Sequence, residues 1–394
     1  MSVVFLLTGL ALVFILAFLA SYNRKGIKYK AIAVMIVIQL VLSFVLLNTR
    51  IGVAIIRSIS KAFDQLMKIG ISGVDFVFGG LENKGVSTFF LDVLLPIIFI
   101  SVLIGILNYF KILPLIIKYV GLLLSKVNGM GKLENYIAVS SAFLGQSEVF
   151  LTTKEQLPHV SKRRLYTLCT SAMSAVSIAI VGAYMTMIPP KYVVTAIVLN
   201  ILSALIIANI INPYDLKEEE DLLIVDHDKK KPSFFQMISE SIMDGFKVAV
   251  IVGAMLIGFI ALINLINYLF DFIFGISFQN LLGYVFAPIA FLMGIPWAEA
   301  VKAGSVMATK LVTNEFVAMG DLGKMAHSLS EKTLAITSVF LVSFANFGSI
   351  GIITGSVKAL SENQGDIVAK FGLKLLYGST LASILSATIA GLFF

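Results

Sequence analysis

Residues 132–160 read KLENYIAVSSAFLGQSEVFLTTKEQLPHV, and a second stretch of the same character, AFLMGIPWAEAVKAGSVMATKLVTNEFVAMG, fills residues 290–320. Both are semi-apolar, rich in small and polar residues, and carry carboxylates, so neither is apolar enough to cross a bilayer alone. Each is followed by an apolar run with small polar residues in its middle, 166–188 after the first and 333–354 after the second. Two polar-interrupted segments at matching places in two halves are typical of a transporter built from inverted repeats.

The composition around these stretches is that of an integral membrane protein. Of the 394 residues, 58% are hydrophobic and 13% are charged, whereas soluble domains hold about 45–50% apolar and about 25% charged residues. Eight apolar runs are long enough to span a bilayer as helices: 3–21, 31–47, 90–110, 166–188, 193–211, 247–270, 333–354 and 375–394. This composition excludes a secreted disulfide scaffold and a nucleic-acid-binding domain, and the single cysteine, Cys169, excludes an intrachain disulfide.

Lysine and arginine in the short loops predict the orientation of the helices. The first loop has four basic residues between positions 24 and 30, which places it inside and both chain ends outside. The loop at 212–240, with Lys217 and Lys229–Lys231, is then also inside. The stretch 50–75 has helical periodicity but too many polar residues to span, so we expect a helix in the membrane interface.

The carboxylates of the two semi-apolar stretches are the first candidates for a functional site. Glu148 ends the sequence Gly145-Gln146-Ser147-Glu148, and Glu315 lies within Thr313-Asn314-Glu315-Phe316. A charge at membrane depth costs about 2.5–3.5 kcal/mol on insertion scales, so such residues face a cavity or a partner. Non-helical backbone is tolerated at this depth where it lines a watery cavity. The alternative is that both carboxylates lie in ordinary interfacial loops.

Three further polar residues suit a ligand with many hydrogen-bonding groups. The amide of Gln146 offers an acceptor and two donors, which matches the edge of a nucleobase, although a glutamine that bridges two helices is as common. Asn346 and Ser349 are three residues apart and would share a helix face. With Glu315 they could hold a polyol such as ribose. Polar residues that only join helices are the alternative reading.

These motifs resemble the signatures of the concentrative nucleoside transporter family, in particular its bacterial NupC-type branch. The resemblance rests on Gly145–Glu148, on KLVTNEFVA at 310–318 and on SFANFGSI at 343–350, and it extends over nearly the whole chain. It implies a multi-pass protein of a bacterial inner membrane, surrounded by lipid and assembled as a homotrimer. In each subunit a transport part would move against a scaffold part, as in an elevator.

The resulting fold prediction is an all-α polytopic membrane protein with about eight transmembrane helices and two reentrant hairpins in inverted repeats. Residues 1–110 are assigned to scaffold helices and the interfacial helix, and 111–211 to the first transport repeat. Residues 212–275 are assigned to a cytoplasmic loop and a scaffold helix, and 276–394 to the second transport repeat. The hairpins are 132–160 and 290–320.

The resemblance also implies roles for individual residues. In similar proteins the first hairpin reads the nucleobase, which carries over to Gln146, Ser147 and Glu148. The N-E-F motif and the second broken helix hold the ribose, which carries over to Glu315, Asn346 and Ser349. The Gln146 amide suits the edge of uracil or cytosine, so we expect pyrimidine nucleosides to be preferred.

The coupling ion is where this sequence departs from the sodium-coupled members. They have an asparagine where this chain has Ser141, and the loss of an amide oxygen weakens a site for a hard cation. Proton-coupled bacterial members look like this chain at Ser141, and a carboxylate removed from water is easier to protonate. We therefore expect proton symport with Glu148 or Glu315 as the carrier. Sodium, held by Ser141 and Ser174, is the alternative.

Two functions of other classes, an intramembrane enzyme and a passive channel, are alternatives to transport. An intramembrane enzyme would need a nucleophile and a base close together, and the motifs contain no such set, so we expect neither an enzyme nor a cofactor. A passive channel would not accumulate solute against a gradient. Only the family motifs speak against it, because hairpins and buried carboxylates would serve a channel as well.

Overall fold

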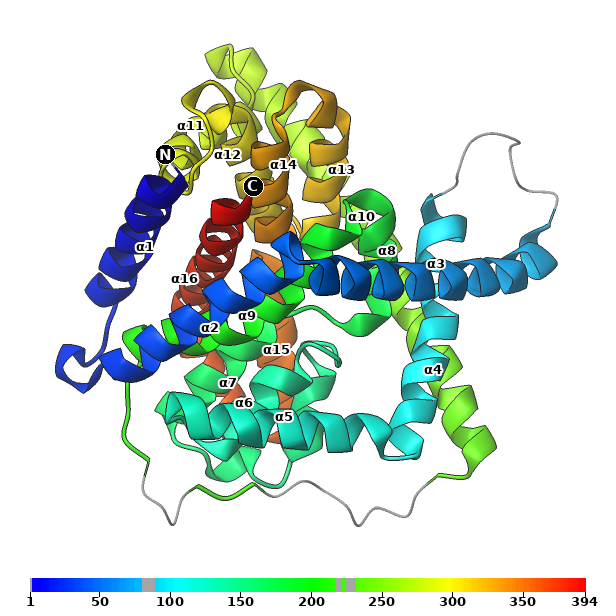
Figure 1. Ribbon diagram of the computed structural model, residues 1–394. Helices are drawn as coiled ribbons and strands as arrows, with labels where there is room; N and C mark the ends of the chain where they lie inside the picture. Colours follow the sequence, from blue (N-terminus) through cyan, green and yellow to red (C-terminus); the bar gives the residue numbers. More distant parts are fainter. Residues whose placement is uncertain (1, 80–88, 217–220, 224–231) are drawn as a thin grey trace.

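The computed structural model describes residues 2–79, 89–216, 221–223 and 232–394, and all regular elements among them are helices (Figure 1). Both termini lie at the upper end of the molecule in this view, whereas α5 and α6 lie at the lower end. This agrees with the prediction that both chain ends are on one side. Lys217 and Lys229–Lys231, which supported that prediction, lie outside the described residues.

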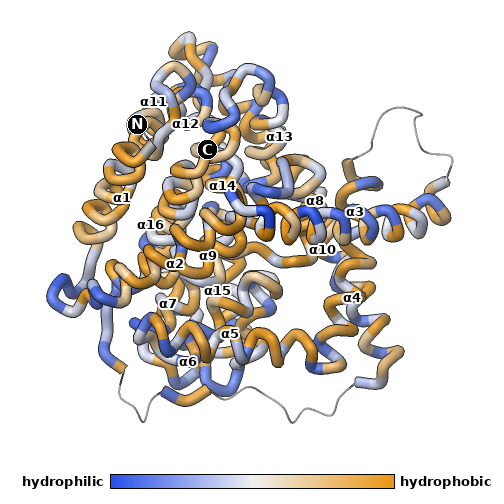
Figure 2. The backbone as a smooth tube through the Cα atoms, in the orientation of Figure 1, coloured by the Kyte–Doolittle hydropathy of each residue, from blue (hydrophilic) through white to orange (hydrophobic). Residues whose placement is uncertain are grey.

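A helix occupies each of the eight predicted apolar runs. They are α1 (Ser2–Leu19), α2 (Tyr29–Asn48), α4 (Ile97–Tyr109), α7 (Lys162–Ser174) with α8 (Ile178–Met187), α9 (Pro190–Ile211), α10 (Phe234–Phe274), α14 (Glu331–Leu341) with α15 (Phe347–Leu360), and α16 (Glu362–Ala390). Two runs contain broken helices, as the polar residues in their middles predicted. Hydrophobic residues extend along α1, α2 and α4 (Figure 2).

Two helices lie across the direction of the others (Figure 1). The first, α3 (Arg50–Phe78), is the predicted interfacial helix; it begins where the Thr49 hydroxyl accepts a hydrogen bond from the Gly52 N–H at 3.1 Å. Polar and apolar residues alternate along it (Figure 2). The second, α5 (Ile112–Asn128), was not predicted, because lysines such as Lys118 interrupt its apolar residues.

Each semi-apolar stretch forms a hairpin, and the two hairpins enter from opposite ends of the molecule (Figure 1). The first consists of α6 (Lys132–Ser140), a non-helical tip, and the short turns Glu148–Thr153 and Leu157–His159. The second consists of α12 (Trp297–Val312) and α13 (Glu315–Met325). The first arm therefore begins inside the predicted range of 290–320, whereas the second arm ends beyond it.

The second hairpin is preceded by a helix that the sequence did not predict. Helix α11 (Phe278–Leu292) packs along α12 and is separated from it by a bend of 118°. Gly294 lies in the bend with φ at 107°, a backbone conformation that favours glycine. The bend therefore turns the chain back before the hairpin begins.

The interior of the molecule is formed by α9 and α16. Their apolar windows are each 83% buried, whereas that of α10 is only 17% buried. Helix α10 has 41 residues, which corresponds to about 60 Å and exceeds the thickness of a bilayer. Its exposed apolar surface is suited to lipid or to a neighbouring subunit.

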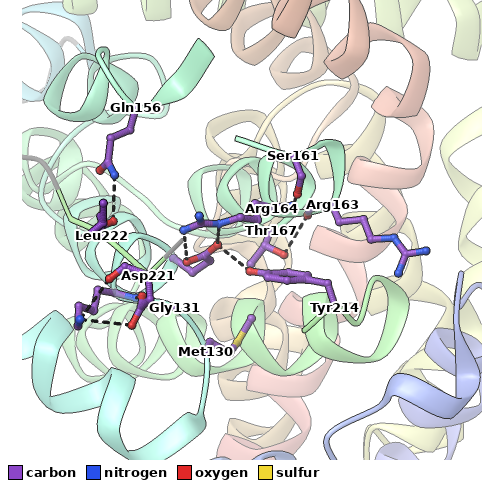
Figure 3. A network of polar contacts seen from close by, with 12 residues as sticks. Met130, Gly131, Gln156, Ser161, Arg163, Arg164, Thr167, Tyr214, Asp221 and Leu222 are labelled. Carbon is purple, nitrogen blue, oxygen red and sulfur yellow. Dashed lines mark hydrogen bonds and ion pairs between the residues drawn. The ribbon is translucent and has the colours of Figure 1, made fainter. Parts of the chain in front are cut away.

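A buried ion pair ties α7 to the base of the first hairpin, and a tyrosine of the segment after α9 joins it (Figure 3). Arg164 donates to the two carboxylate oxygens of Glu134 from Nε at 2.6 Å and from Nη2 at 3.1 Å. The Tyr214 hydroxyl donates to Glu134 at 2.7 Å. Burial and the neighbouring Glu134 hold the pKa of Tyr214 well above its usual value, so this hydroxyl remains a donor.

We predict that Arg164→Met destabilises the protein strongly, because it leaves the buried Glu134 carboxylate without its cation. Removing one partner of a buried pair costs about 3–5 kcal/mol, so the apparent melting temperature in detergent should fall clearly. The double variant with Glu134→Gln should recover part of the loss. Lys132→Ala, which removes the half-exposed pair with Asp221, is the control and should change stability by about 1 kcal/mol or less. An unchanged melting temperature for Arg164→Met would contradict the prediction.

Candidate functional site

The two broken helices end and restart through polar caps. Helix α7 ends at Ser174, Ala175 is extended, and the Ser177 hydroxyl accepts from the Ala179 N–H at 3.3 Å to begin α8. Helix α15 begins in the same way, since the Asn346 side-chain oxygen accepts from the Ser349 N–H at 2.9 Å. The polar residues seen in the sequence are therefore the caps of half-helices.

This arrangement corrects one detail of the sequence analysis. Asn346 has extended backbone angles, φ −148° and ψ 166°, and lies just before α15. It does not share a helix face with Ser349, as the spacing of three predicted. The two residues are nevertheless adjacent, because the Asn346 side chain caps the N–H of Ser349.

Backbone hydrogen bonds bring the breaks and the first hairpin tip together. The Phe344 N–H, in the second break, donates to the Ala175 carbonyl in the first at 3.1 Å. The Ile178 N–H donates to the Phe143 carbonyl, in the first hairpin tip, at 3.3 Å. The polar segments of the two repeats therefore meet at one place.

Glu315 lies at this meeting point and is 4% exposed. Its carboxylate accepts from the Tyr184 hydroxyl at 2.8 Å and from the Asn346 amide nitrogen at 3.3 Å. The predicted pair of Glu315 and Asn346 is thus brought together. Tyr184, from the first repeat, was not predicted to belong to the site. The only signal in the sequence is that α8 is otherwise apolar except for one other hydroxyl, that of Thr186.

The first hairpin tip presents its polar residues differently. The Glu148 side chain is exposed and turns back on its own loop, where it accepts from the Gly145 N–H at 2.9 Å. Gln146 is 9% exposed. Among the described residues, its side-chain oxygen is buried without a hydrogen-bond partner, and so is the hydroxyl of Ser349. Buried polar atoms usually have partners, and of these two residues only Gln146 lines a cavity, so its oxygen is suited to a bound ligand.

A cavity of about 530 Å³ joins the hairpin tip to Glu315. Such a volume is in the usual range for small-molecule sites. Its polar lining residues are Ser101, Asn108, Gln146, Ser147, Glu148, Thr152, Ser177, Ser241, Asp244 and Glu315. Asn108 is near the C-terminal end of α4, and Ser241 and Asp244 are near the N-terminal end of α10. The cavity therefore extends to the place where α4 ends and α10 begins. Asn346 and Ser349 are behind Glu315 and do not line it.

The charge of the lining limits the kind of ligand. The described lining residues include three carboxylates, Glu148, Asp244 and Glu315, and neither lysine nor arginine. A phosphate or another anion would meet only like charge here. The cavity therefore suits a neutral molecule with several hydroxyl or amide groups, or one that enters together with a cation.

The two serines considered for sodium have different environments. The Ser141 hydroxyl donates to the Ile137 carbonyl at 2.6 Å, one turn back along the chain. The Ser174 hydroxyl is buried and has no hydrogen-bond partner among the described residues. One serine is thus engaged by its own helix, and the other is free to bind a cation or water.

Comparisons with known families cover almost the whole chain. Residues 8–81 match the family model described as Na+ dependent nucleoside transporter N-terminus. Residues 90–191 match a model described as Nucleoside recognition, and residues 192–391 match Na+ dependent nucleoside transporter C-terminus.

Individual relatives and solved structures agree with these matches. The purine nucleoside transport protein NupG of Bacillus subtilis is 38% identical, with 98% of each chain covered. The nucleoside permease NupC of Helicobacter pylori is 31% identical over 100% of this chain and 98% of its own. The structure of CNTnw in an inward-facing substrate-bound state has a TM-score of 0.93 at 31% identity, covering 100% of this chain and 99% of that one. A variant of CNTnw in an outward-facing state has a TM-score of 0.94 at 30% identity, covering 100% and 98%.

Proposed function

Because the chain belongs to the concentrative nucleoside transporter family, and is thus a multi-pass membrane transporter of nucleosides rather than an enzyme, we propose that it imports pyrimidine nucleosides together with protons. The observation that carries this proposal is the single cavity that joins the amide of the first hairpin tip to the Glu315 cluster. A nucleoside has the matching chemistry: a planar base with donors and acceptors at one end and a polyol at the other.

Each end of the cavity is assigned one half of the substrate. Gln146, Ser147 and Glu148 bind the nucleobase, with the unpaired Gln146 oxygen as an acceptor. Glu315 binds the ribose, and the other two predicted ribose residues, Asn346 and Ser349, support it from outside the cavity: the Asn346 amide and the Tyr184 hydroxyl hold the Glu315 carboxylate, and the Asn346 oxygen caps the Ser349 N–H. The absence of basic side chains among the described lining residues suits nucleosides and disfavours nucleotides.

The packing of the helices suggests how the moving part is divided from the scaffold. Helix α4 packs on α10, whereas α1 and α2 pack on α16 and α9. We therefore assign α3, α4 and α10 to the scaffold of a homotrimer, and we assign α1 and α2 to the transport part together with both repeats. This assignment differs from the boundary at residue 110, which groups α1 and α2 with the scaffold.

Glu315→Gln is expected to abolish nucleoside binding, because an amide cannot replace both acceptor oxygens of the carboxylate. Tyr184→Phe removes one hydrogen bond to that carboxylate, and a bond to a charged group contributes about 1.5–3 kcal/mol. We expect its affinity for uridine to fall by at least about tenfold. Binding of radiolabelled uridine to purified protein would test both variants, with thermal stability as the control for folding. Undiminished uridine affinity in Glu315→Gln would remove the ribose role.

The nucleobase preference rests on Gln146, and a second candidate competes with it. A relative 38% identical is described as a purine nucleoside transport protein, which favours purine nucleosides. We expect uridine and cytidine to compete for uptake better than inosine and guanosine. Gln146→Ala should weaken nucleoside binding more than ribose binding. Gln156→Ala is the control and should leave nucleoside binding unchanged, because Gln156 donates to the Leu222 carbonyl and does not line the cavity. Stronger competition by purine nucleosides would replace the pyrimidine proposal.

Proton coupling is supported by Ser141, which lacks the amide oxygen that a hard cation would use, and by the burial of the Glu315 carboxylate. Sodium is the second candidate, since the matching family models are described as Na+ dependent and the Ser174 hydroxyl is unpaired among the described residues.

Uptake into proteoliposomes distinguishes the two ions. With a pH gradient alone, we expect uridine to accumulate against its own concentration gradient. This accumulation should be lost when a protonophore is added. With a sodium gradient at equal pH on both sides, we expect only equilibration. Accumulation that needs sodium would overturn proton coupling and direct attention to Ser174.

A further inference from the structure

Lys310 is a fully buried cation that takes no part in lining the nucleoside cavity. It lies on α12 and is 0% exposed. Its ammonium donates to the Phe340 carbonyl and to the Ser343 hydroxyl, each at 2.6 Å, and to the Ser383 hydroxyl at 3.4 Å. The Phe340 ring is also 4.5 Å away. Three oxygens therefore surround the ammonium group at a depth where a charge needs partners.

Two of the three oxygens that hold Lys310 belong to the second break, and the third, that of Ser383, belongs to α16. Phe340 is the penultimate residue of α14, so its carbonyl is one of those that the helix itself leaves unpaired. The C-terminal end of a helix carries partial negative charge and favours a cation. Ser343 lies within the break, three residues before Asn346. The ammonium of Lys310 thus satisfies the end of one half-helix next to the residue that begins the other.

The position in the first repeat that corresponds to Lys310 can be found by aligning the capping residues of the two repeats. The residues that cap α7 and α14, Ser161 and Ser330, are 169 residues apart (330 − 161). Those that cap α8 and α15, Ser177 and Asn346, have the same separation (346 − 177).

The same separation relates Ser343 to Ser174 (343 − 174) and Lys310 to Ser141 (310 − 141). The first repeat therefore has two serines where the second has a serine and a lysine. Ser174 has an unpaired hydroxyl among the described residues, whereas Ser343 is bound by the ammonium. These two serines of the first repeat are the residues that the sequence offers to a diffusible cation.

We propose that Lys310 is a positioning residue whose ammonium serves as a tethered cation in the second repeat, at the place equivalent to the Ser141 and Ser174 pair of the first. It holds the break between α14 and α15 so that Asn346 reaches the Glu315 carboxylate at 3.3 Å. One repeat would thus have a tethered cation, and the other would be open to an exchangeable one. The inference rests on the proposed function, because nucleoside uptake is its main readout.

Chemical rescue provides a readout that a purely structural role would not give. Lys310→Ala removes the cation and leaves space, so methylammonium in the assay should restore the missing donor. Lys310→Met removes the cation but fills the space, so methylammonium should have no effect. We expect both variants to lose uridine uptake by at least about tenfold, and only Lys310→Ala to regain several-fold with methylammonium. Lys302→Met, an exposed lysine on the same helix, is the control and should transport normally.

Stability measurements keep the test decisive if uptake is low for other reasons. Methylammonium should raise the melting temperature of Lys310→Ala and leave that of the wild type and Lys310→Met unchanged. Ser343→Ala keeps the lysine and should raise the KM for uptake a few-fold. Uptake by Lys310→Met equal to that of the wild type, or the absence of any methylammonium effect on Lys310→Ala, would overturn the inference. Failure of the wild type to take up any nucleoside would instead refute the proposed function, and the melting temperatures would still test Lys310.

Discussion

The hydrogen bond from the Phe344 N–H to the Ala175 carbonyl joins two helices that are both interrupted inside the membrane part. Open backbone in a bilayer is costly unless its N–H and C=O groups have partners. Here the partners come from the other repeat and from side chains. The Asn200 amide donates to the Val342 carbonyl at 2.5 Å, and Lys310 donates to that of Phe340. The breaks can exist only because the two repeats complete each other.

The side chains that satisfy the breaks also hold Glu315, the carboxylate of the proposed substrate site. Asn346 uses its oxygen to cap α15 and its amide nitrogen to hold Glu315. Glu315 in turn receives the hydroxyl of Tyr184 from the first repeat. The proposed recognition site and the fold therefore share their hydrogen bonds, and these bonds join the two repeats at Glu315. A rigid unit of this kind suits transport by displacement of a whole domain.

The two repeats are alike in backbone and different in charge. Both have a serine-capped helix, a break and a capped second half-helix. The second repeat has a buried lysine at its break, and the equivalent position of the first is Ser141. A tethered amine donates to the groups of one break. The other break has no such tethered group among the described residues, and the hydroxyl of Ser174 there is buried without a hydrogen-bond partner.

The sequence alone determined the apolar spans, the two hairpins and the residues at their tips, because these follow from local composition and from the high cost of carboxylates at membrane depth. It did not reveal α5, whose apolar residues are interrupted by lysines, or α11, which a sharp bend separates from α12. Tyr184 and Glu315 are 131 residues apart, and Lys310 and Ser383 are 73 apart. No local pattern predicts which buried polar groups will meet across such separations. Only the tertiary structure decided those pairings, because a polar group inside a membrane must find its partner wherever the packing of the two repeats provides one.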